Sequence, residues 1–213
     1  KPEKRTGIHL ADEELIRGNV PMTKEEVRTV SIAKLKLTKD AVIYDVGAGT
    51  GSVSIEAALQ GENLRVYAIE KNPEGAELIR KNMQKFRTDQ IQVIEGVAPE
   101  ALEDLEMPTH AFIGGSTGQL KEIIQCIKKK NPDVRIVINA ISLETMMQVL
   151  NYTEENKIED VEIIQVAVSR AEKAGSYHMM HGQNPVYVIS FTGKPVKKAE
   201  AAKEEDVVWE ENE

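Results

Sequence analysis

The chain contains a single cysteine, Cys126, among its 213 residues. One cysteine cannot form an internal disulfide and cannot supply the thiolate pairs of a zinc site. Its apolar neighbours recur at helical spacing, which predicts a packed helical position rather than a reactive thiol. The first residues, "KPEKRTG", contain no apolar stretch of the kind found in secretory signals. We therefore expect a cytoplasmic protein.

Long apolar runs and excess positive charge are also missing. No run approaches the roughly 18 consecutive apolar residues of a membrane-spanning helix, so no membrane association is expected. The 27 Lys and Arg residues are outnumbered by 35 Asp and Glu residues, which gives a net charge of −8. Binding to nucleic acid depends on clustered cations that contact phosphates. The charge therefore argues against nucleic acid as a partner.

Histidine is scarce as well, with four in the chain. His178 and His181 stand three residues apart, but no further His or Cys lies near them to complete a metal site. The sequence therefore predicts no metal bound by the protein itself.

What the chain does contain is a regular alternation of strand-like and helical segments. This alternation is typical of an α/β fold with a mostly parallel sheet covered by helices on both faces. We predict one domain over residues 1–193 with a seven-stranded sheet. The strand-like runs are 41–46, 64–70, 91–96, 110–115 and 134–140, followed by 160–171 and 184–193.

The last two runs differ from the first five because no helix separates them. They predict an antiparallel hairpin that closes the sheet, joined by a polar loop, "EKAGSYHMMHGQ". Long loops inside compact domains often carry function. We expect this loop to contribute to the site.

Two segments flank the sheet. Residues 1–40 are predicted to cover the site, with a helix whose first turn is capped by Thr23 and by Glu26 three residues later. Residues 194–213 combine four Lys with seven Asp and Glu and have almost no periodic apolar residues. This composition predicts a disordered tail.

The stretch "VIYDVGAGTGSVSIEAA" places three glycines between a strand and a helix. The dinucleotide pattern G-x-G-x-x-G would need a third glycine where Ser52 stands, and no Lys follows as in a phosphate-binding P-loop. The acidic Glu70 closes the next strand-like run, where a carboxylate can accept hydrogen bonds from ribose hydroxyls. The glycine loop and Glu70 together predict a ligand that contains an adenosine-like ribose. This ligand need not contain a pyrophosphate.

This combination resembles the Rossmann-like class I methyltransferases that use S-adenosylmethionine. The resemblance implies that the loop Gly47, Ala48, Gly49, Thr50 and Gly51 wraps the amino-acid end of the cofactor, and that Glu70 holds the ribose. It also implies that Val97 and Ala98 lie along the adenine and that Thr23 lies against the methionine end. Many methyltransferases of amino groups carry N-P-P-Y after the fourth strand, whereas this chain reads "FIGGS" there.

Five further segments occur in one order: "PMTKEEVR", "EGVAPEAL", "FIGGSTG", "NAISLET" and "NPVYVIS". Together they resemble the decarboxylating cobalt-precorrin-6B C15-methyltransferases of cobalamin biosynthesis. The resemblance covers about residues 7–193. It implies methylation of a meso carbon of a cobalt-containing tetrapyrrole, with decarboxylation of the C12 acetate, and a homo-oligomer, most simply a tetramer.

Such a substrate carries many carboxylates, so an acidic protein needs local cations to bind it. The candidates near the first helix are Arg17, Lys24 and Arg28; those in or beside the final loop are Arg170, Lys173, His178 and His181, with Asn184 at its end. Tyr177 and His178 are candidates for delivering a proton after decarboxylation.

Two other functions remain open at this point. One is a methyltransferase of tRNA or protein built on the same cofactor-binding core. The other is a non-catalytic subunit that binds S-adenosylmethionine. Turnover of a corrinoid precursor distinguishes the three.

Overall fold

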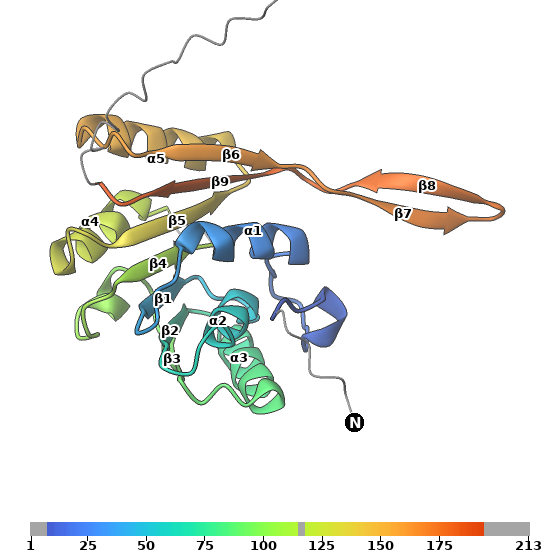
Figure 1. Ribbon diagram of the computed structural model, residues 1–213, viewed down its shortest axis with the longest axis horizontal. Helices are drawn as coiled ribbons and strands as arrows, with labels where there is room; N and C mark the ends of the chain where they lie inside the picture. The colour runs from blue at the N-terminus through green and yellow to red at the C-terminus, as the bar shows by residue number, and fades with distance from the viewer. Residues whose placement is uncertain (1–7, 115–117, 194–213) are drawn as a thin grey trace, which may run out of the picture.

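A computed structural model describes residues 8–114 and 118–193 of the chain. Its seven-stranded sheet has the order β3-β2-β1-β4-β5-β9-β6, and Figure 1 shows the helices packed around it. Pairing is parallel from β3 to β5 and antiparallel where β9 meets β5 and β6. The predicted fold class is confirmed. The strands are β1 Val42–Val46, β2 Arg65–Glu70, β3 Ile91–Glu95, β4 His110–Ile113, β5 Arg135–Ala140, β6 Glu162–Val166 and β9 Val186–Phe191.

Helices cover both faces of the sheet, each packing an apolar stripe against it. On one face lie α1 Glu25–Leu35, α2 Ser52–Ala58 and α3 Pro73–Phe86. On the other lie α4 Leu120–Lys130 and α5 Leu143–Glu155. Two short 3₁₀ turns, Asp12–Glu14 and Glu100–Leu102, are the other helical elements of residues 8–114 and 118–193.

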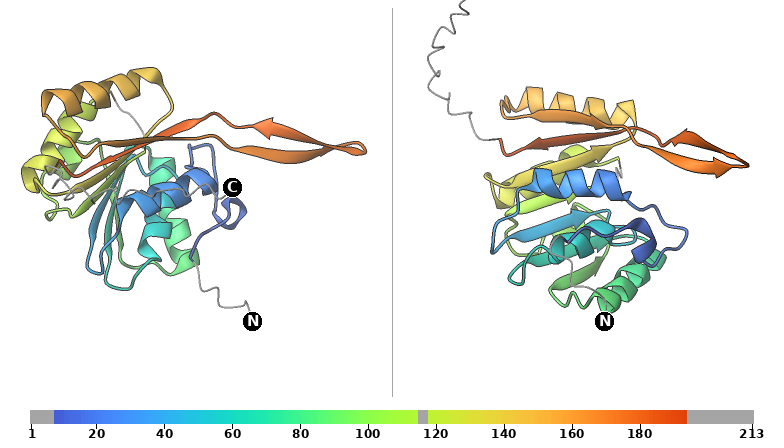
Figure 2. Two further views of the ribbon diagram at one scale, coloured as in Figure 1. Left: turned by 45° about the horizontal axis from the view of Figure 1, so that its top comes forward. Right: turned by 45° about the vertical axis from the view of Figure 1, so that its right-hand side comes forward.

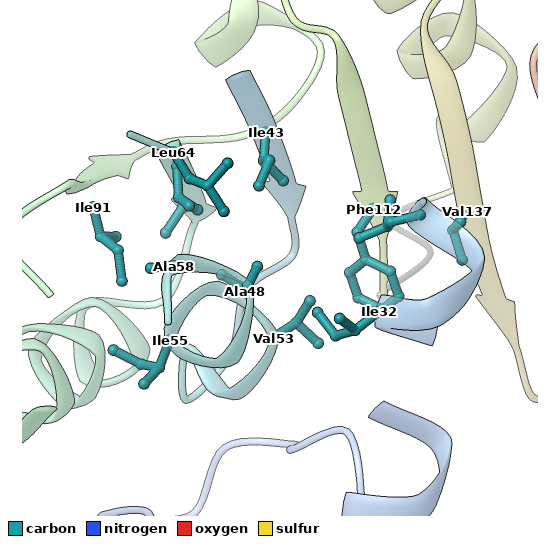
Figure 3. Close-up of a cluster of buried hydrophobic side chains, with 14 of the residues drawn as sticks. Ile32, Ile43, Ala48, Val53, Ile55, Ala58, Leu64, Ile91, Phe112 and Val137 are labelled. Atoms are coloured by element: carbon teal, nitrogen blue, oxygen red, sulfur yellow. The ribbon is translucent and has the colours of Figure 1, made fainter. Parts of the chain in front are cut away.

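The core consists of two apolar clusters separated by the sheet. Figure 3 shows part of the first, in which Ile32 of α1 and Val53 of α2 lie near Phe112 of β4. Central strands buried on both faces read as continuous apolar runs, which is why they were recognisable in the sequence. Cys126 is partly buried against the second cluster, as its helical spacing predicted.

The segment predicted as a long polar loop is instead a second sheet. Strands β7 Ser169–Ala174 and β8 Tyr177–Gly182 form an antiparallel hairpin, with Gly175 in the turn at φ 64°. A left-handed residue at this place is what a tight hairpin turn requires. The hairpin extends away from the body of the molecule (Figures 1 and 2). Every residue of β8 is exposed, so its sequence has no apolar face to indicate a strand.

The predicted cap of α1 is also wrong. Lys24, not Thr23, precedes the helix, and no side chain of this residue caps it. The amide of Glu25 instead donates to the side chain of Asp12 at 3.0 Å. A carboxylate there satisfies an amide of the first turn and complements the helix dipole. The cap comes from a distant segment, which a local capping pattern does not reveal.

None of the helices in the described ranges is long and apolar enough to cross a membrane. The predicted tail, residues 194–213, lies outside the described residues.

Candidate active site

A cavity of about 670 Å³ opens at the carboxyl ends of the parallel strands. Ligands of open α/β sheets bind at this edge. Segments predicted separately from the sequence meet here. The lining includes residues 20–24, 46–49, 69–72 and 96–98, together with Gly114, Asn139, Ile141, Gln183 and Asn184.

The glycine loop follows β1 and wraps one wall of the cavity. Gly47, Gly49 and Gly51 all have positive φ, at 76°, 57° and 78°, a region that glycine occupies at little cost. At Gly49 a Cβ atom would stand 2.5 Å from the carbonyl oxygen of Pro21. Gly49 therefore lets residues 20–24, the covering segment, approach the loop closely.

Glu70 ends β2 beside this loop. One carboxylate oxygen accepts the amide of Gly49 at 2.7 Å, and the other accepts the amide of Asn72 at 2.7 Å. Each oxygen keeps a second lone pair for a ligand hydroxyl. Gly75 permits this arrangement, because a Cβ there would lie 2.8 Å from Glu70 Cγ.

These features fit S-adenosylmethionine. The cavity combines a backbone cradle that a Cβ would fill at Gly49 with a fixed carboxylate at Glu70. Val97 and Ala98 line the same cavity, as does Thr23. Thr50 and Gly51 are not part of the lining: Thr50 is fully buried, and Gly51 precedes α2.

Asp45, the acidic residue at the start of the glycine motif, is buried at the end of β1. Burial raises the pKa of its carboxyl group to about 7, although a 2.5 Å hydrogen bond from Ser54 opposes the shift. Among the described residues, Asp45 Oδ1 has no hydrogen-bond partner. The protonated form is thus favoured over a wide pH range, because an unpaired buried carboxylate is poorly solvated.

We expect Asp45→Asn to flatten the dependence of stability on pH. The carboxyl of an unfolded chain titrates near 3.9, so between about pH 4 and pH 7 the folded protein binds one more proton than the unfolded chain. Stability contributed by Asp45 is therefore lost as pH rises through 7. Urea unfolding from about pH 5 to about pH 8 should show the wild type losing roughly 2–3 kcal/mol relative to the variant. A difference that stays constant with pH contradicts the prediction.

Arg28 was expected among the cations that bind substrate, but it has no exposed surface. Its guanidinium donates to Glu56 at 2.6 Å, to Asp12 at 3.2 Å and to the carbonyl of Thr23 at 2.7 Å. It also donates to the carbonyl of Leu10. The expectation is wrong: these contacts use four of the five guanidinium N–H groups, and the fully buried side chain cannot reach a substrate carboxylate.

The remaining substrate candidates divide into two groups. Lys24 and Asn184 line the cavity. Arg17, Arg170 and His181 are not in the lining. Arg170 donates instead to Glu26 at 2.6 Å, and the neighbouring carboxylate raises the pKa of its guanidinium.

Tyr177 and His178 stand at the start of β8, in the projecting hairpin. Tyr177 is 75% exposed, and neither residue lines the cavity. Across the hairpin, His178 pairs with Lys173, and His181 lies 3.8 Å from Glu172.

Several residues of the site were not singled out from the sequence. Asn139 lines the cavity from β5, and Gln183 lines it beside Asn184. Asp12 and Glu56 hold Arg28. Asn139 begins the "NAISLET" segment at the carboxyl end of a strand, which is the position from which side chains reach such a site. No group of His, Cys, Asp and Glu that could hold a metal ion occurs within residues 8–114 and 118–193.

The sequence was compared with known families and proteins. Residues 14–193 match the precorrin methyltransferase domain. The chain is 41% identical over 184 residues to a probable cobalt-precorrin-6B C(15)-methyltransferase (decarboxylating) of Sulfolobus acidocaldarius, which covers 84% of this chain and 95% of that one. It is 38% identical over 183 residues to the cobalt-precorrin-6B C(15)-methyltransferase (decarboxylating) of Salmonella typhimurium, covering 85% and 94% of the two chains.

A solved structure shares the fold closely. The precorrin-6y C5,15-methyltransferase of Geobacter metallireducens superposes with a TM-score of 0.80 at 38% identity. The match covers 86% of this chain and 97% of the other. The two chains are therefore similar in both overall fold and sequence.

Proposed function

The chain belongs to the precorrin methyltransferase family, and we propose that it methylates C15 of cobalt-precorrin-6B and removes a carboxylate from the same substrate. The observation that carries this proposal is the family match over residues 14–193, which includes the glycine loop and the whole cavity wall. A methyltransferase of tRNA or protein has no comparable support, and the net charge of −8 opposes it.

S-adenosylmethionine, when bound, supplies a methyl group on a positively charged sulfur. Gly47, Ala48 and Gly49 would hold its amino-acid end, while Glu70 would accept its ribose hydroxyls. Val97 and Ala98 would lie along the adenine. Thr23 would contact the methionine end through the covering segment. Thr50 and Gly51 would act indirectly, by fixing the backbone of the loop.

The protein's own contribution is alignment and exclusion of water. The covering segment, residues 20–24, and the residues before β9 both line the cavity at the strand ends. Holding two reactants in register removes much of the entropic barrier to their reaction. A tetrapyrrole can itself provide the nucleophilic carbon, so the site needs no nucleophilic side chain.

The function is tested by incubating the full chain with S-adenosylmethionine and cobalt-precorrin-6B. We expect S-adenosylhomocysteine and carbon dioxide in equal amounts, together with a methylated corrinoid seen by mass spectrometry. Binding of S-adenosylmethionine without any turnover would indicate a non-catalytic subunit. Turnover with transfer RNA and not with the corrinoid would indicate the other alternative.

Lys24 is the cation we propose for a substrate carboxylate. Lys24 lines the cavity, and its Nζ stands 3.9 Å from Asp12, a separation that leaves its N–H donors available. Lys24→Ala should weaken corrinoid binding by about tenfold, the effect of losing one charged hydrogen bond. Affinity for S-adenosylhomocysteine should stay unchanged in the same calorimetric experiment.

Arg170→Ala is the matched control, since it removes a cation from the same end of the molecule. Arg170 is already paired with Glu26, so we expect little change in corrinoid binding. If Arg170→Ala weakens corrinoid binding and Lys24→Ala does not, the proposal for Lys24 is wrong. Arg170, Arg17 and His181 would then be the candidates for binding the substrate.

We further propose a homo-oligomer, most simply a tetramer, of single-domain chains spanning residues 1–193 that work in the cytoplasm. The projecting hairpin supports assembly, because Tyr177, Met179 and Met180 are 75%, 56% and 65% exposed on it. Apolar side chains exposed together favour association. Proton delivery by Tyr177 or His178 would then involve a neighbouring copy. Sedimentation of the full chain measures the number of copies.

A further inference from the structure

Asn139 is a buried polar residue in the wall of the cavity. It lies on β5, opposite Val188 of β9, and only 8% of its surface is exposed. Side chains alternate along a strand. Asn139 therefore shares a face of the sheet with Val137, which belongs to the cluster under α1. Its neighbour across this face is Ser31 of α1.

The hydroxyl of Ser31 determines how the Asn139 amide is turned. Ser31 Oγ lies 2.7 Å from the carbonyl oxygen of Val27 and 3.0 Å from Asn139 Oδ1. A hydroxyl has one proton and cannot donate to both oxygens. The Val27 carbonyl has no proton to give, so it must be the acceptor.

Asn139 must therefore be the donor in its contact with Ser31. The oxygen and nitrogen of an amide are assigned from their hydrogen bonds and not from their positions. Turning the amide by 180° lets its NH₂ group donate to Ser31 Oγ, which donates in turn to Val27. The amide oxygen then faces away from Ser31. No other hydrogen bond to the Asn139 side chain occurs in the described part of the chain.

The Asn139 amide oxygen, with no donor from the described part of the chain, restricts which ligand groups can lie against this part of the cavity wall. It attracts hydrogen-bond donors and positive charge, and it repels the carboxylates of a tetrapyrrole. Strands β1 and β4 separate β5 from β2, which puts Asn139 about 14 Å from the Glu70 end of the cavity at the usual spacing of strands. When the ribose of a cofactor is held at Glu70, the ligand group that contacts Asn139 lies at the opposite end of that cofactor.

We propose that Asn139 presents its side-chain oxygen to the sulfonium end of S-adenosylmethionine, with Ser31 as the residue that positions it. The inference rests on the proposed function. Hydrogens on a carbon next to a positive sulfur carry part of its charge and form C–H···O contacts with carbonyl oxygens. S-adenosylhomocysteine has a neutral sulfur and no methyl group. Asn139 would therefore favour the reactive cofactor over the spent one.

Calorimetry with both cofactors tests this directly. Asn139→Leu keeps the size of the side chain and removes the oxygen. We expect affinity for S-adenosylmethionine to fall by about fivefold, as for the loss of one C–H···O contact, with affinity for S-adenosylhomocysteine changed by less than about twofold. Ser31→Ala leaves the amide in place but frees it to turn, so its effect should have the same direction and be smaller. This second variant keeps the test open if Asn139→Leu does not fold.

Asn184→Leu is the matched control, because it removes another amide from the lining of the same cavity. The ratio of the two affinities should not change in that variant. Equal losses for both cofactors in Asn139→Leu would overturn the inference and leave Asn139 a residue of the cavity wall only. A loss of corrinoid affinity alone would overturn it too, since the NH₂ group would then face the substrate. A wild-type protein that binds neither cofactor would instead refute the proposed function.

Discussion

Gly49→Val should abolish binding of S-adenosylmethionine while the protein still folds. Gly49 has φ 57°, a conformation that a β-branched residue avoids. A Cβ atom at this position would also stand 2.5 Å from the carbonyl oxygen of Pro21. The loop or the covering segment must therefore move. Either movement breaks the contact of the Gly49 amide with Glu70 and opens the cavity. Calorimetry should detect no binding up to millimolar cofactor.

Gly175→Val provides the control for backbone strain alone. Gly175 has φ 64°, but nothing lies within 4 Å of the Cβ that a substitution would add. It lies in the hairpin turn, away from the cavity lining. Both variants place a β-branched residue at positive φ, so their local backbone strain is similar. If cofactor binding is lost in Gly49→Val and kept in Gly175→Val, the loss is due to the position of Gly49 in the glycine loop. Unchanged affinity in Gly49→Val would contradict the cofactor assignment.

The sheet, and the meeting of the glycine loop with Glu70 in one cavity, were predictable from the sequence because their signals are local. A buried parallel strand is a continuous apolar run, and a loop with positive φ angles requires glycines. Glu70 follows from the same reasoning, since it ends the strand next to the glycine loop. Each of these features is encoded within about ten residues.

The hairpin β7–β8 was not predictable in the same way. Strand patterns arise from one buried face, whereas this hairpin is exposed on nearly every residue within a single chain. Its residues therefore resemble those of a loop. Arg170 and His181 lie on this hairpin. They were expected beside the cavity because a loop in its place would fold back over the strand ends.

Interactions between distant segments were the other source of error. Arg28 lies on an amphipathic helix among charged neighbours, so its position suggested a surface cation. Its acidic partners are Asp12 and Glu56, which belong to different elements. Asn139 and Ser31 also meet across 108 positions of sequence. No local pattern shows that such residues pair.

Arg28→Met should cause the largest loss of stability among single substitutions in this site. The variant keeps most of the side-chain volume but leaves Glu56, whose side chain is fully buried, without its cation. Removing one partner of a buried ion pair typically costs about 3–5 kcal/mol, because the remaining charge is neither hydrated nor paired. Urea unfolding measures the loss. His9 also contacts Glu56 at 2.8 Å, but its side chain is half exposed, so it replaces little of the lost interaction.

The double variant Arg28→Met, Glu56→Gln separates the unpaired charge from the lost packing. Glu56→Gln removes the stranded negative charge, so the double variant should be more stable than Arg28→Met alone. Neither change should restore the hydrogen bond to the carbonyl of Thr23, which holds the covering segment over the cavity. Cofactor affinity should therefore stay reduced in the double variant although stability partly returns. Recovery of stability and cofactor affinity together in the double variant would mean that Arg28 supports only the fold. A loss of less than about 1 kcal/mol in Arg28→Met would show that the buried charges do not stabilise the protein as their contacts indicate.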